Sequence, residues 1–164
     1  MMAPELRIRS ADPDDAEIVR EIAVRAFAEY RDLLDPPPGI LFESVEIIRF
    51  AITNQVVVLA EIGDCSVGTA RLELRPTGGY IGRFAVLPGY RGQGIATHLM
   101  DHLEARAAAS GRLMTTVTVR EALPANIHFF EHRGYTVTNR EPHPRIPTTV
   151  TITLTKTLAS ASIL

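Results

Sequence analysis

The sequence predicts an α/β (α+β) domain in which about seven strands form one mixed, mostly antiparallel sheet and about four helices pack on it. Two observations predict this class. Short β-branched or alternating segments are interspersed with longer segments whose apolar residues recur at helical spacing. In addition, the strand expected at 80–87 runs directly through a glycine-rich turn into a helix, which is typical of a β-to-α unit with a parallel partner strand.

The N-terminal part predicts one strand and two helices. Residues 6–9 alternate as in a strand, and the acidic, proline-containing run at 10–15 is typical of a helix start. Apolar residues then recur on one helical face as far as Tyr30. Three prolines at 36–38 favour an extended connector, and residues 41–51 predict a second amphipathic helix.

Three strands are expected to follow in meander order. Residues 55–62 are β-branched, residues 67–75 alternate, and Gly63-Asp64 between them predicts an antiparallel hairpin. The third strand, 80–87, should therefore lie well inside the sheet. The single cysteine, Cys65, falls in the expected hairpin turn and is interpreted as a partly exposed free thiol.

The C-terminal half predicts a crossover to a parallel strand. A helix at 94–110 ends near Gly111, and the short apolar segment 113–119 reads as a buried strand parallel to 80–87. We expect this parallel pair to splay apart beyond its last shared hydrogen bonds, leaving a slot for a long cofactor tail. The remaining predicted elements are a short helix at 124–133 and strands at 135–140 and 148–157.

Composition limits the function classes. The 164 residues suit one domain, 1–164, and 46% hydrophobic with 22% charged residues indicates a soluble globular protein. A formal net charge of −2 gives no ground for nucleic-acid binding. One cysteine excludes an internal disulfide framework, and the histidines lack ligand spacing, so no metal is expected.

Location is predicted from what the sequence lacks. The N-terminus has no basic stretch followed by an apolar core, and no apolar run approaches the ~20 residues that a membrane span needs. We therefore expect no membrane association and a cytoplasmic protein.

The run Arg91-Gly92-Gln93-Gly94-Ile95-Ala96 is the most informative motif of the chain. The first amides of a helix have no intrahelical acceptor and carry partial positive charge, so they suit a phosphate that small residues allow to approach. Arg91 would add a guanidinium group that can donate two parallel hydrogen bonds to the phosphate. The alternative is an ordinary β-to-α turn. The motif lacks the Gly-Lys of a P-loop and the glycine spacing of a dinucleotide fold.

Two segments resemble the GNAT superfamily of N-acyltransferases. Arg91, Gly94 and Ala96 match its acyl-CoA loop, Arg/Gln-x-x-Gly-x-Gly/Ala, position by position. Asn126 and Gly134-Tyr135 match a second acyl-CoA segment of one branch of the superfamily, in the right order and spacing. In that second segment, the family's tyrosine is replaced here by Phe130, so a proposed general acid lacks its hydroxyl.

The resemblance implies transfer of an acyl group, usually acetyl, from acetyl-CoA to a primary amine of a small molecule or protein by direct attack. It also divides the chain into an acceptor-side part (1–53), an acyl-CoA-binding core (55–135), C-terminal strands (136–158) and a tail (159–164), and it leaves a homodimer open. The residues expected to contact acyl-CoA are Phe84, Ala85, Val86, Arg91, Gly92, Gln93, Gly94, Ile95, Ala96, Asn126 and Phe130.

Candidate residues for the acceptor and for proton transfer are less specific. Glu73 is the candidate general base because it lies mid-strand where the site is expected, although a solvent-facing role is the main alternative. Tyr80 and His128 are the next candidates, and Tyr80 is also a possible acceptor contact. Tyr30 and Phe42 are further acceptor contacts, with core packing as the alternative for each.

Two other function classes stay open at this point. A non-catalytic acyl-CoA sensor would explain the phenylalanine at position 130 and the uncertain base. A phosphate- or nucleotide-binding domain of unrelated fold would follow if the glycine loop were the whole evidence.

Overall fold

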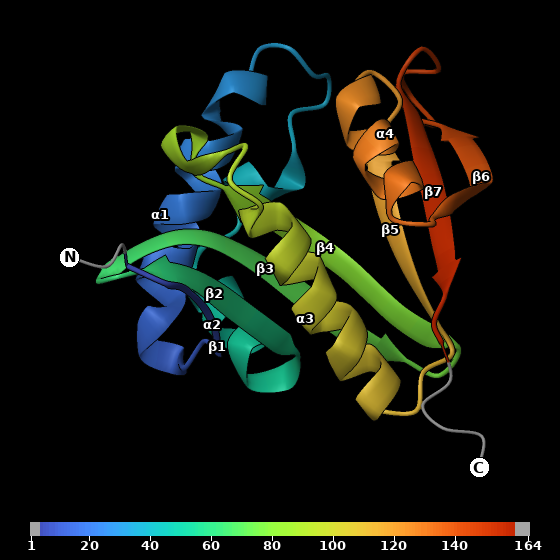
Figure 1. Ribbon diagram of the computed structural model, residues 1–164. Helices are drawn as coiled ribbons and strands as arrows, with labels where there is room; N and C mark the ends of the chain where they lie inside the picture. Colours follow the sequence, from blue (N-terminus) through green and yellow to red (C-terminus); the bar gives the residue numbers. More distant parts are fainter. Residues whose placement is uncertain (1–3, 160–164) are drawn as a thin grey trace. The chain divides into compact units, whose positions relative to one another are not determined.

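The computed structural model describes residues 4–159, and the predicted fold class is confirmed (Figure 1). Seven strands within this range form one sheet in the order β1-β2-β3-β4-β5-β7-β6, with β4 and β5 parallel. The strands are β1 (Leu6–Ser10), β2 (Val56–Ile62), β3 (Cys65–Arg75), β4 (Gly78–Val86), β5 (Met114–Arg120), β6 (Thr136–Pro142) and β7 (Val150–Thr157). The α-helices are α1 (Ala16–Phe27), α2 (Val45–Asn54), α3 (Ile95–Ala109) and α4 (Pro124–His132).

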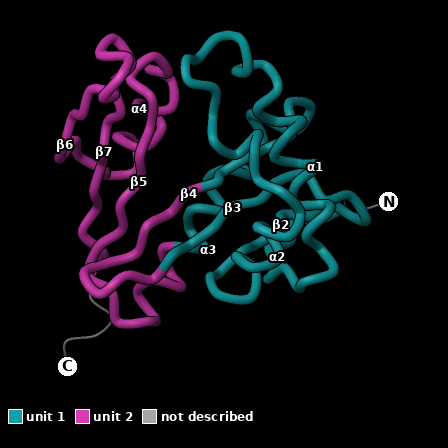
Figure 2. The backbone as a smooth tube through the Cα atoms, turned by 180° about the vertical axis from the view of Figure 1, so that it is seen from behind, with its two compact units in different colours: residues 1–73, 83–103 teal, residues 74–82, 104–164 magenta. Residues whose placement is uncertain are grey.

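The chain divides into two compact units (Figure 2). The first comprises residues 1–73 and 83–103, and the second comprises 74–82 and 104–164. Each unit has its own buried residues and its own charged network, and each is described separately below. The single domain over 1–164 and its functional parts stay a prediction.

The core of the first unit lies between two helices and one face of the sheet. The buried residues of α1 and α2 pack with strand residues of β2 and β4 in one apolar cluster. Helix α3 packs on the other face (Figure 1), where a Cβ on Gly68 would stand 3.3 Å from Leu99 and 3.2 Å from the carbonyl oxygen of Ala85. Gly68 therefore lets β3 lie close to both β4 and α3. The cluster contains Val19, Ile22, Ala23, Ala26, Ile48, Ala51, Val57, Leu59, Ala85 and Leu87.

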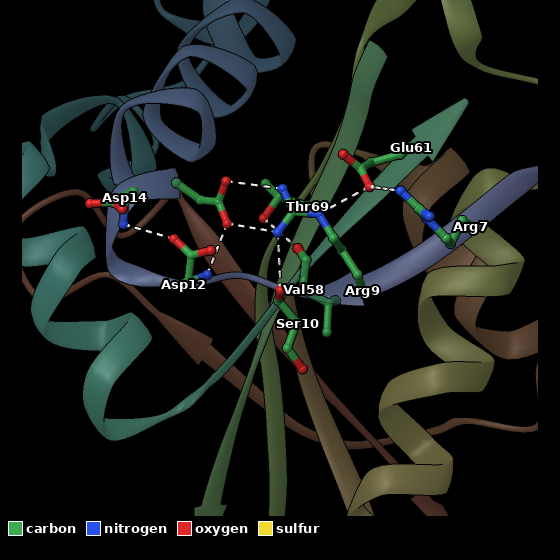
Figure 3. Close-up of polar contacts among 9 residues, drawn as sticks. Arg7, Arg9, Ser10, Asp12, Asp14, Val58, Glu61 and Thr69 are labelled. Atoms are coloured by element: carbon green, nitrogen blue, oxygen red, sulfur yellow. Dashed lines mark hydrogen bonds and ion pairs between the residues drawn. The ribbon is translucent and has the colours of Figure 1, made fainter. Parts of the chain in front are cut away.

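A polar cluster fixes the first strand to the rest of this unit (Figure 3). Arg9 donates to both carboxylate oxygens of Asp15, at 2.7 and 3.0 Å, and to Glu61 at 3.0 Å. The hydrogen bond from Arg9 lowers the pKa of Asp15. Burial of Glu61 opposes its ionisation, but hydrogen bonds from Arg7 and Arg9 outweigh that effect, so its pKa is also lowered. Both carboxylates are therefore charged partners of the arginines near neutral pH.

The second unit is built on β5, β6, β7 and α4. Buried Val150, Ile152 and Leu154 confirm the predicted alternation of the last strand. The parallel pairing of β4 with β5 joins Gly79 to Thr115 and Tyr80 to Thr116. A Cβ on Gly78 would lie 2.8 Å from the side chain and 2.9 Å from the carbonyl oxygen of Met114, so only glycine fits where β4 begins.

A buried charge network crosses this unit. Glu104 on α3 is 8% exposed and accepts hydrogen bonds from Lys156 at 2.9 Å and from the Tyr135 hydroxyl at 2.8 Å. Arg133 forms an ion pair with the same carboxylate at 3.0 Å. Tyr135 also bonds Thr115 at 2.8 Å. Burial is the main cause that raises the pKa of Tyr135 far above its ordinary value, so the phenol keeps its proton.

The structure corrects the predicted second helix. A 3-10 turn at Gly39–Phe42 precedes α2, which begins at Val45 because the Ser44 hydroxyl accepts from the Ile47 amide at 3.2 Å and caps the helix. Core packing for Phe42 is wrong, since this side chain is 70% exposed.

Two smaller expectations concern a thiol and the chain end. Cys65 is a free, exposed cysteine as predicted, but it begins β3 opposite Ile62 and does not sit in the turn. The tail at 159–164 lies outside the described residues apart from Ala159.

Candidate functional site

The glycine loop joins β4 to α3 in the conformation that a helix-start anion site requires. Strand β4 ends at Val86, a 3-10 turn spans Pro88–Tyr90, and α3 begins at Ile95. Gly92 and Gly94 have φ angles of +78° and +83°, in the left-handed region that other residues rarely adopt. The two glycines are therefore required by backbone conformation and not only by packing.

Space above the loop is open to a ligand. A Cβ on Gly92 would meet no described atom within 4 Å, and one on Gly94 would lie 3.8 Å from the His98 ring. The His98 ring nitrogen Nδ1 lies 2.7 Å from the Gly94 carbonyl oxygen. Residues 91–94 are exposed, whereas Ile95 is 2% exposed and anchors the helix start in the core. An anion can thus reach backbone amides on a fixed support.

Arg91 is already held by groups of the first unit. Its guanidinium donates to Glu29 at 2.6 Å, to the Ala26 carbonyl at 2.9 Å and to the Val86 carbonyl at 3.2 Å. The sequence predicted that this side chain binds phosphate in bidentate fashion, and in the structure it ties the loop to the end of α1. A bound anion would share Arg91 with Glu29, so the glycine amides are the more available donors.

The strand residues before the loop present backbone and not side chains. Ala85 is 2% exposed and Val86 is 9% exposed, and Phe84 is half-buried. The Leu87 amide donates to the Val67 carbonyl at 2.9 Å and holds the strand end against β3. Sequence reasoning assigned this stretch a backbone role, and these burial values are consistent with it.

Two more predicted contacts lie on α4, in the second unit. Asn126 is exposed, and α4 has no side-chain cap, so Asn126 does not cap this helix. Phe130 is 7% exposed and makes edge-to-face contacts with Phe129 and Tyr135, with ring centroids 5.1 and 5.6 Å away. Phe130 is therefore a packed aromatic residue of this unit.

The candidate proton-transfer residues have different surroundings. Glu73 is half-buried near the end of β3. The Tyr80 hydroxyl lies 2.7 Å from the Thr118 hydroxyl, and the Arg75 guanidinium stacks 4.4 Å from the Tyr80 ring centroid. The His128 side chain is 78% exposed, with Nδ1 3.7 Å from Glu131. Glu73 belongs to the first unit, and Tyr80 and His128 belong to the second.

The early helical region places two predicted acceptor contacts in the first unit. Tyr30 is half-buried at the end of the 3-10 turn Ala28–Tyr30 and packs edge-to-face on Phe27, at 5.6 Å between centroids. Phe42 is exposed just before Glu43. Its exposure leaves its aromatic ring available to a ligand.

A charged cluster in the first unit escaped the sequence reasoning. Glu43 accepts two hydrogen bonds from Arg71, each at 3.1 Å, and forms an ion pair with Arg83 at 3.3 Å. The three residues are far apart in the sequence, so no spacing pattern could reveal them. The only weak signal was an arginine immediately before the Phe84–Val86 stretch.

Neither a metal-binding cluster nor a membrane-spanning helix is found among the described residues. Within residues 4–159, no three His, Cys, Asp or Glu side chains are grouped so that they could hold a metal ion. Among the helices described here, none has both the length and the apolar character needed to cross a bilayer.

The fold and the loop together define a class of protein. A strand, a turn with two left-handed glycines and an exposed helix start form a β-to-α unit in a mixed sheet, with a geometry that suits an anion. The profile of the Acetyltransferase (GNAT) family matches residues 18–135, most of the chain, so the chain belongs to this family. It is therefore an acyl-CoA-dependent acyltransferase, and the resemblance seen in the sequence is confirmed.

Solved structures with the same fold include three from different organisms. A GCN5-related N-acetyltransferase from Rhodopseudomonas palustris has a TM-score of 0.77 and 25% identity, covering 96% of this chain and 99% of that one. PaiA N-acetyltransferase from Thermoplasma acidophilum, in complex with coenzyme A, has a TM-score of 0.81 and 16% sequence identity, and the match covers 93% of this chain and 99% of that one. The ribosomal-protein-S18-alanine N-acetyltransferase from Escherichia coli has a TM-score of 0.76 and 19% sequence identity, and the match covers 97% of each chain. The last two show the fold alone.

Proposed function

We propose that this protein transfers an acetyl group from acetyl-CoA to a primary amine by direct attack in a ternary complex. The observation that carries the proposal is the glycine loop, in which Gly92 and Gly94 at positive φ open the backbone of the α3 start to an anion. The pyrophosphate of the co-substrate would bind there. Family membership supports acyl-CoA as the co-substrate, which the loop geometry alone would leave open.

The thioester arm would bind along the end of β4. Backbone groups of residues 84–86 would bond this arm as an added strand, and an adjacent amide would polarise the acyl carbonyl. Their side chains are buried or half-buried, which leaves the backbone as the recognition element. Asn126 and Phe130 are assigned to the cofactor through the family motif only.

The acceptor must lose a proton before it attacks. A primary amine with a pKa of roughly 10.4 is mostly protonated at neutral pH, so a base or an ordered water has to take the proton. The nitrogen then bonds the acyl carbon, and the carbon–sulfur bond breaks with its electron pair on sulfur. Glu73 is the candidate base, with Tyr80 and His128 as the next candidates.

Phe130 affects the leaving thiolate. Phenylalanine has no hydroxyl, so it cannot donate a proton, but a thiolate with a pKa near ~8.5 is a tolerable leaving group near neutral pH. We therefore propose an active enzyme of modest rate. The same observation favours a second candidate, an acyl-CoA sensor without turnover.

The acceptor class is open to both small molecules and proteins. One solved structure of the same fold is named for alanine of a ribosomal protein, so the fold does not restrict the acceptor to a small amine.

Two measurements test the proposed function. Calorimetric titration with acetyl-CoA, ATP and NAD should show binding of acetyl-CoA in preference to the two nucleotides. A thiol-release assay over a panel of amines should then show turnover above spontaneous hydrolysis. Binding without release from any amine would favour the sensor, and tighter binding of ATP or NAD would overturn the acyl-CoA assignment.

A further inference from the structure

The charged cluster of Glu43, Arg71 and Arg83 carries a net positive charge beside the proposed thioester strand. Glu43 lies between the 3-10 turn Gly39–Phe42 and α2, and the side chains of Glu43 and Arg71 are each 12% exposed. Two guanidinium groups share one carboxylate, which leaves one positive charge without a neutralising partner inside the cluster. Because the bidentate bonds from Arg71 occupy both Glu43 oxygens, Arg83 is the arginine held less tightly.

Arg83 has the features of a residue held for a ligand. Its φ angle of +50° is in the left-handed region, which is uncommon for an arginine and marks a strained backbone position. Its side chain is 41% exposed, and Nε makes the contact with Glu43. Its terminal nitrogens both lie 3.4 Å from where a Cβ on Gly39 would stand, so the absence of a side chain at Gly39 lets the guanidinium occupy this place.

Arg71 supplies a second, independent observation. Its Nε is buried and has no hydrogen-bond partner among the described residues. A buried donor of a charged group without a partner is rare in folded proteins and calls for a water or a ligand oxygen. All three residues line one small hollow of the first unit that has room for about one water molecule, together with the apolar or neutral residues Val19, Ala23, Ile40, Ile48, Val57, Thr69 and Ala70.

We propose that Arg83 binds a carboxylate of the acceptor, and that Arg71 and Glu43 position it. The acceptor would then be an amine that also carries a carboxylate, such as an α-amino acid. This inference rests on the proposed function and specifies its acceptor. Arg83 directly precedes Phe84 on the strand, and a strand advances only about 3.3 Å per residue. A carboxylate on Arg83 would therefore keep a nearby amine close to the acyl group that residues 84–86 are proposed to hold.

The charges favour a carboxylate over a cationic group. A second ammonium or guanidinium at Arg83 would meet a net positive cluster, whereas a carboxylate would complete its charge balance. A planar guanidinium also matches a carboxylate in bidentate fashion. Arg71 and Glu43 are positioning residues in this scheme.

The test compares an α-amino acid with its carboxamide, which keeps the amine and side chain but lacks the negative charge. Thiol release from acetyl-CoA would be measured with the wild type, Arg83→Gln and the control Arg25→Gln. Arg25 is an exposed arginine of α1 that pairs only loosely with Glu21, at 3.7 Å. The wild type should prefer the amino acid by about 10- to 100-fold in kcat/KM. Arg83→Gln should remove most of this preference through KM, and Arg25→Gln should keep it.

Three results would overturn the proposal: equal use of both acceptors by the wild type, a preference that survives in Arg83→Gln, or an equal loss on both acceptors in that variant. Arg83→Lys adds a check, because it should keep part of the preference by retaining charge. A short peptide with an acidic first residue tests whether the carboxylate belongs to a peptide and not to a free amino acid. Loss of its acetylation in Arg83→Gln would support the same carboxylate site.

Failure of the proposed function would look different. If acetyl-CoA binds but no amine releases thiol, calorimetry with the N-acetyl amino acid and its carboxamide still decides the carboxylate site. Tighter binding of the carboxylate by the wild type, lost in Arg83→Gln, would support it. Equal binding of both compounds would contradict it.

Discussion

Replacement of Glu104 by glutamine tests the energetic role of the buried charge network. Glutamine keeps the shape of the side chain and can still bond the Tyr135 hydroxyl, but it removes the charge that faces Arg133 and Lys156. The Glu104 and Arg133 side chains are only 10% and 11% exposed. Arg133 and Lys156 then lose the carboxylate that they share, and water cannot fully replace it at the largely buried arginine.

The magnitude follows from this burial. Removing one partner of a buried ion pair typically costs about 3–5 kcal/mol. Lys156 is 26% exposed and can turn toward solvent, so we expect about 2–4 kcal/mol here. For a chain of this length that loss lowers the thermal midpoint by roughly 5–15 °C.

The matched control lies in the same unit. Glu121 and Arg140 also form a bidentate pair, at 2.6 and 2.9 Å, but these side chains are 42% and 57% exposed. Glu121→Gln should therefore change the midpoint little, because exposed pairs contribute little. Both variants would be compared by calorimetry and urea unfolding. Equal shifts in the two variants would refute the burial argument.

Three further predictions concern catalysis, the cofactor and pH. Phe130→Tyr should raise turnover at fixed amine by up to ~10²-fold without much change in acetyl-CoA affinity, since general-acid help typically contributes 10²–10⁴-fold; an unchanged rate would mean that another group already protonates the thiolate. Asn126→Ala should weaken acetyl-CoA binding in calorimetry while leaving the apo melting midpoint unchanged, because this exposed residue caps no helix; a loss of apo stability with intact affinity would contradict it. Asp15→Asn should destabilise the protein in urea near pH 7, and the difference in unfolding free energy from wild type should shrink as pH falls below about 4. The reason is that the pKa of Asp15 is lowered in the folded protein, so its carboxylate stabilises the fold only at pH values where the same carboxyl of the unfolded chain is ionised. A difference that stays constant down to pH 3 would refute this role.

The fold could be predicted because its signals are local. The glycine pair at 92 and 94 and the alternation of 150–154 each follow from a few neighbouring residues. The start of α2 was misplaced because the apolar residues at 41 and 42 continue the helical pattern, whereas the Ser44 cap starts the helix at Val45. Local periodicity could not distinguish a 3-10 turn from the first turn of a helix.

The site could be predicted only in part, because its contacts are not local. The sequence identified Arg91 but not its partner Glu29, which is 62 residues away, so the side chain was expected to be free for phosphate. Likewise, the pairing of Glu43 with Arg71 depends on how the segment before α2 lies against β3. The left-handed φ of Arg83 has no signal in its residue type, since arginine rarely adopts it.

The most direct test of the acyl-CoA site is calorimetric titration of acetyl-CoA into wild type, Gly94→Glu and the control Gly89→Ala. Glutamate at position 94 would place an anion at the proposed pyrophosphate position and strain a φ of +83°, whereas a Cβ on exposed Gly89 would meet no described atom within 4 Å. We predict that Gly94→Glu stays folded by circular dichroism and loses measurable binding, while Gly89→Ala binds as the wild type does. Unchanged acetyl-CoA affinity in folded Gly94→Glu would contradict the assignment of the glycine loop as the acyl-CoA site.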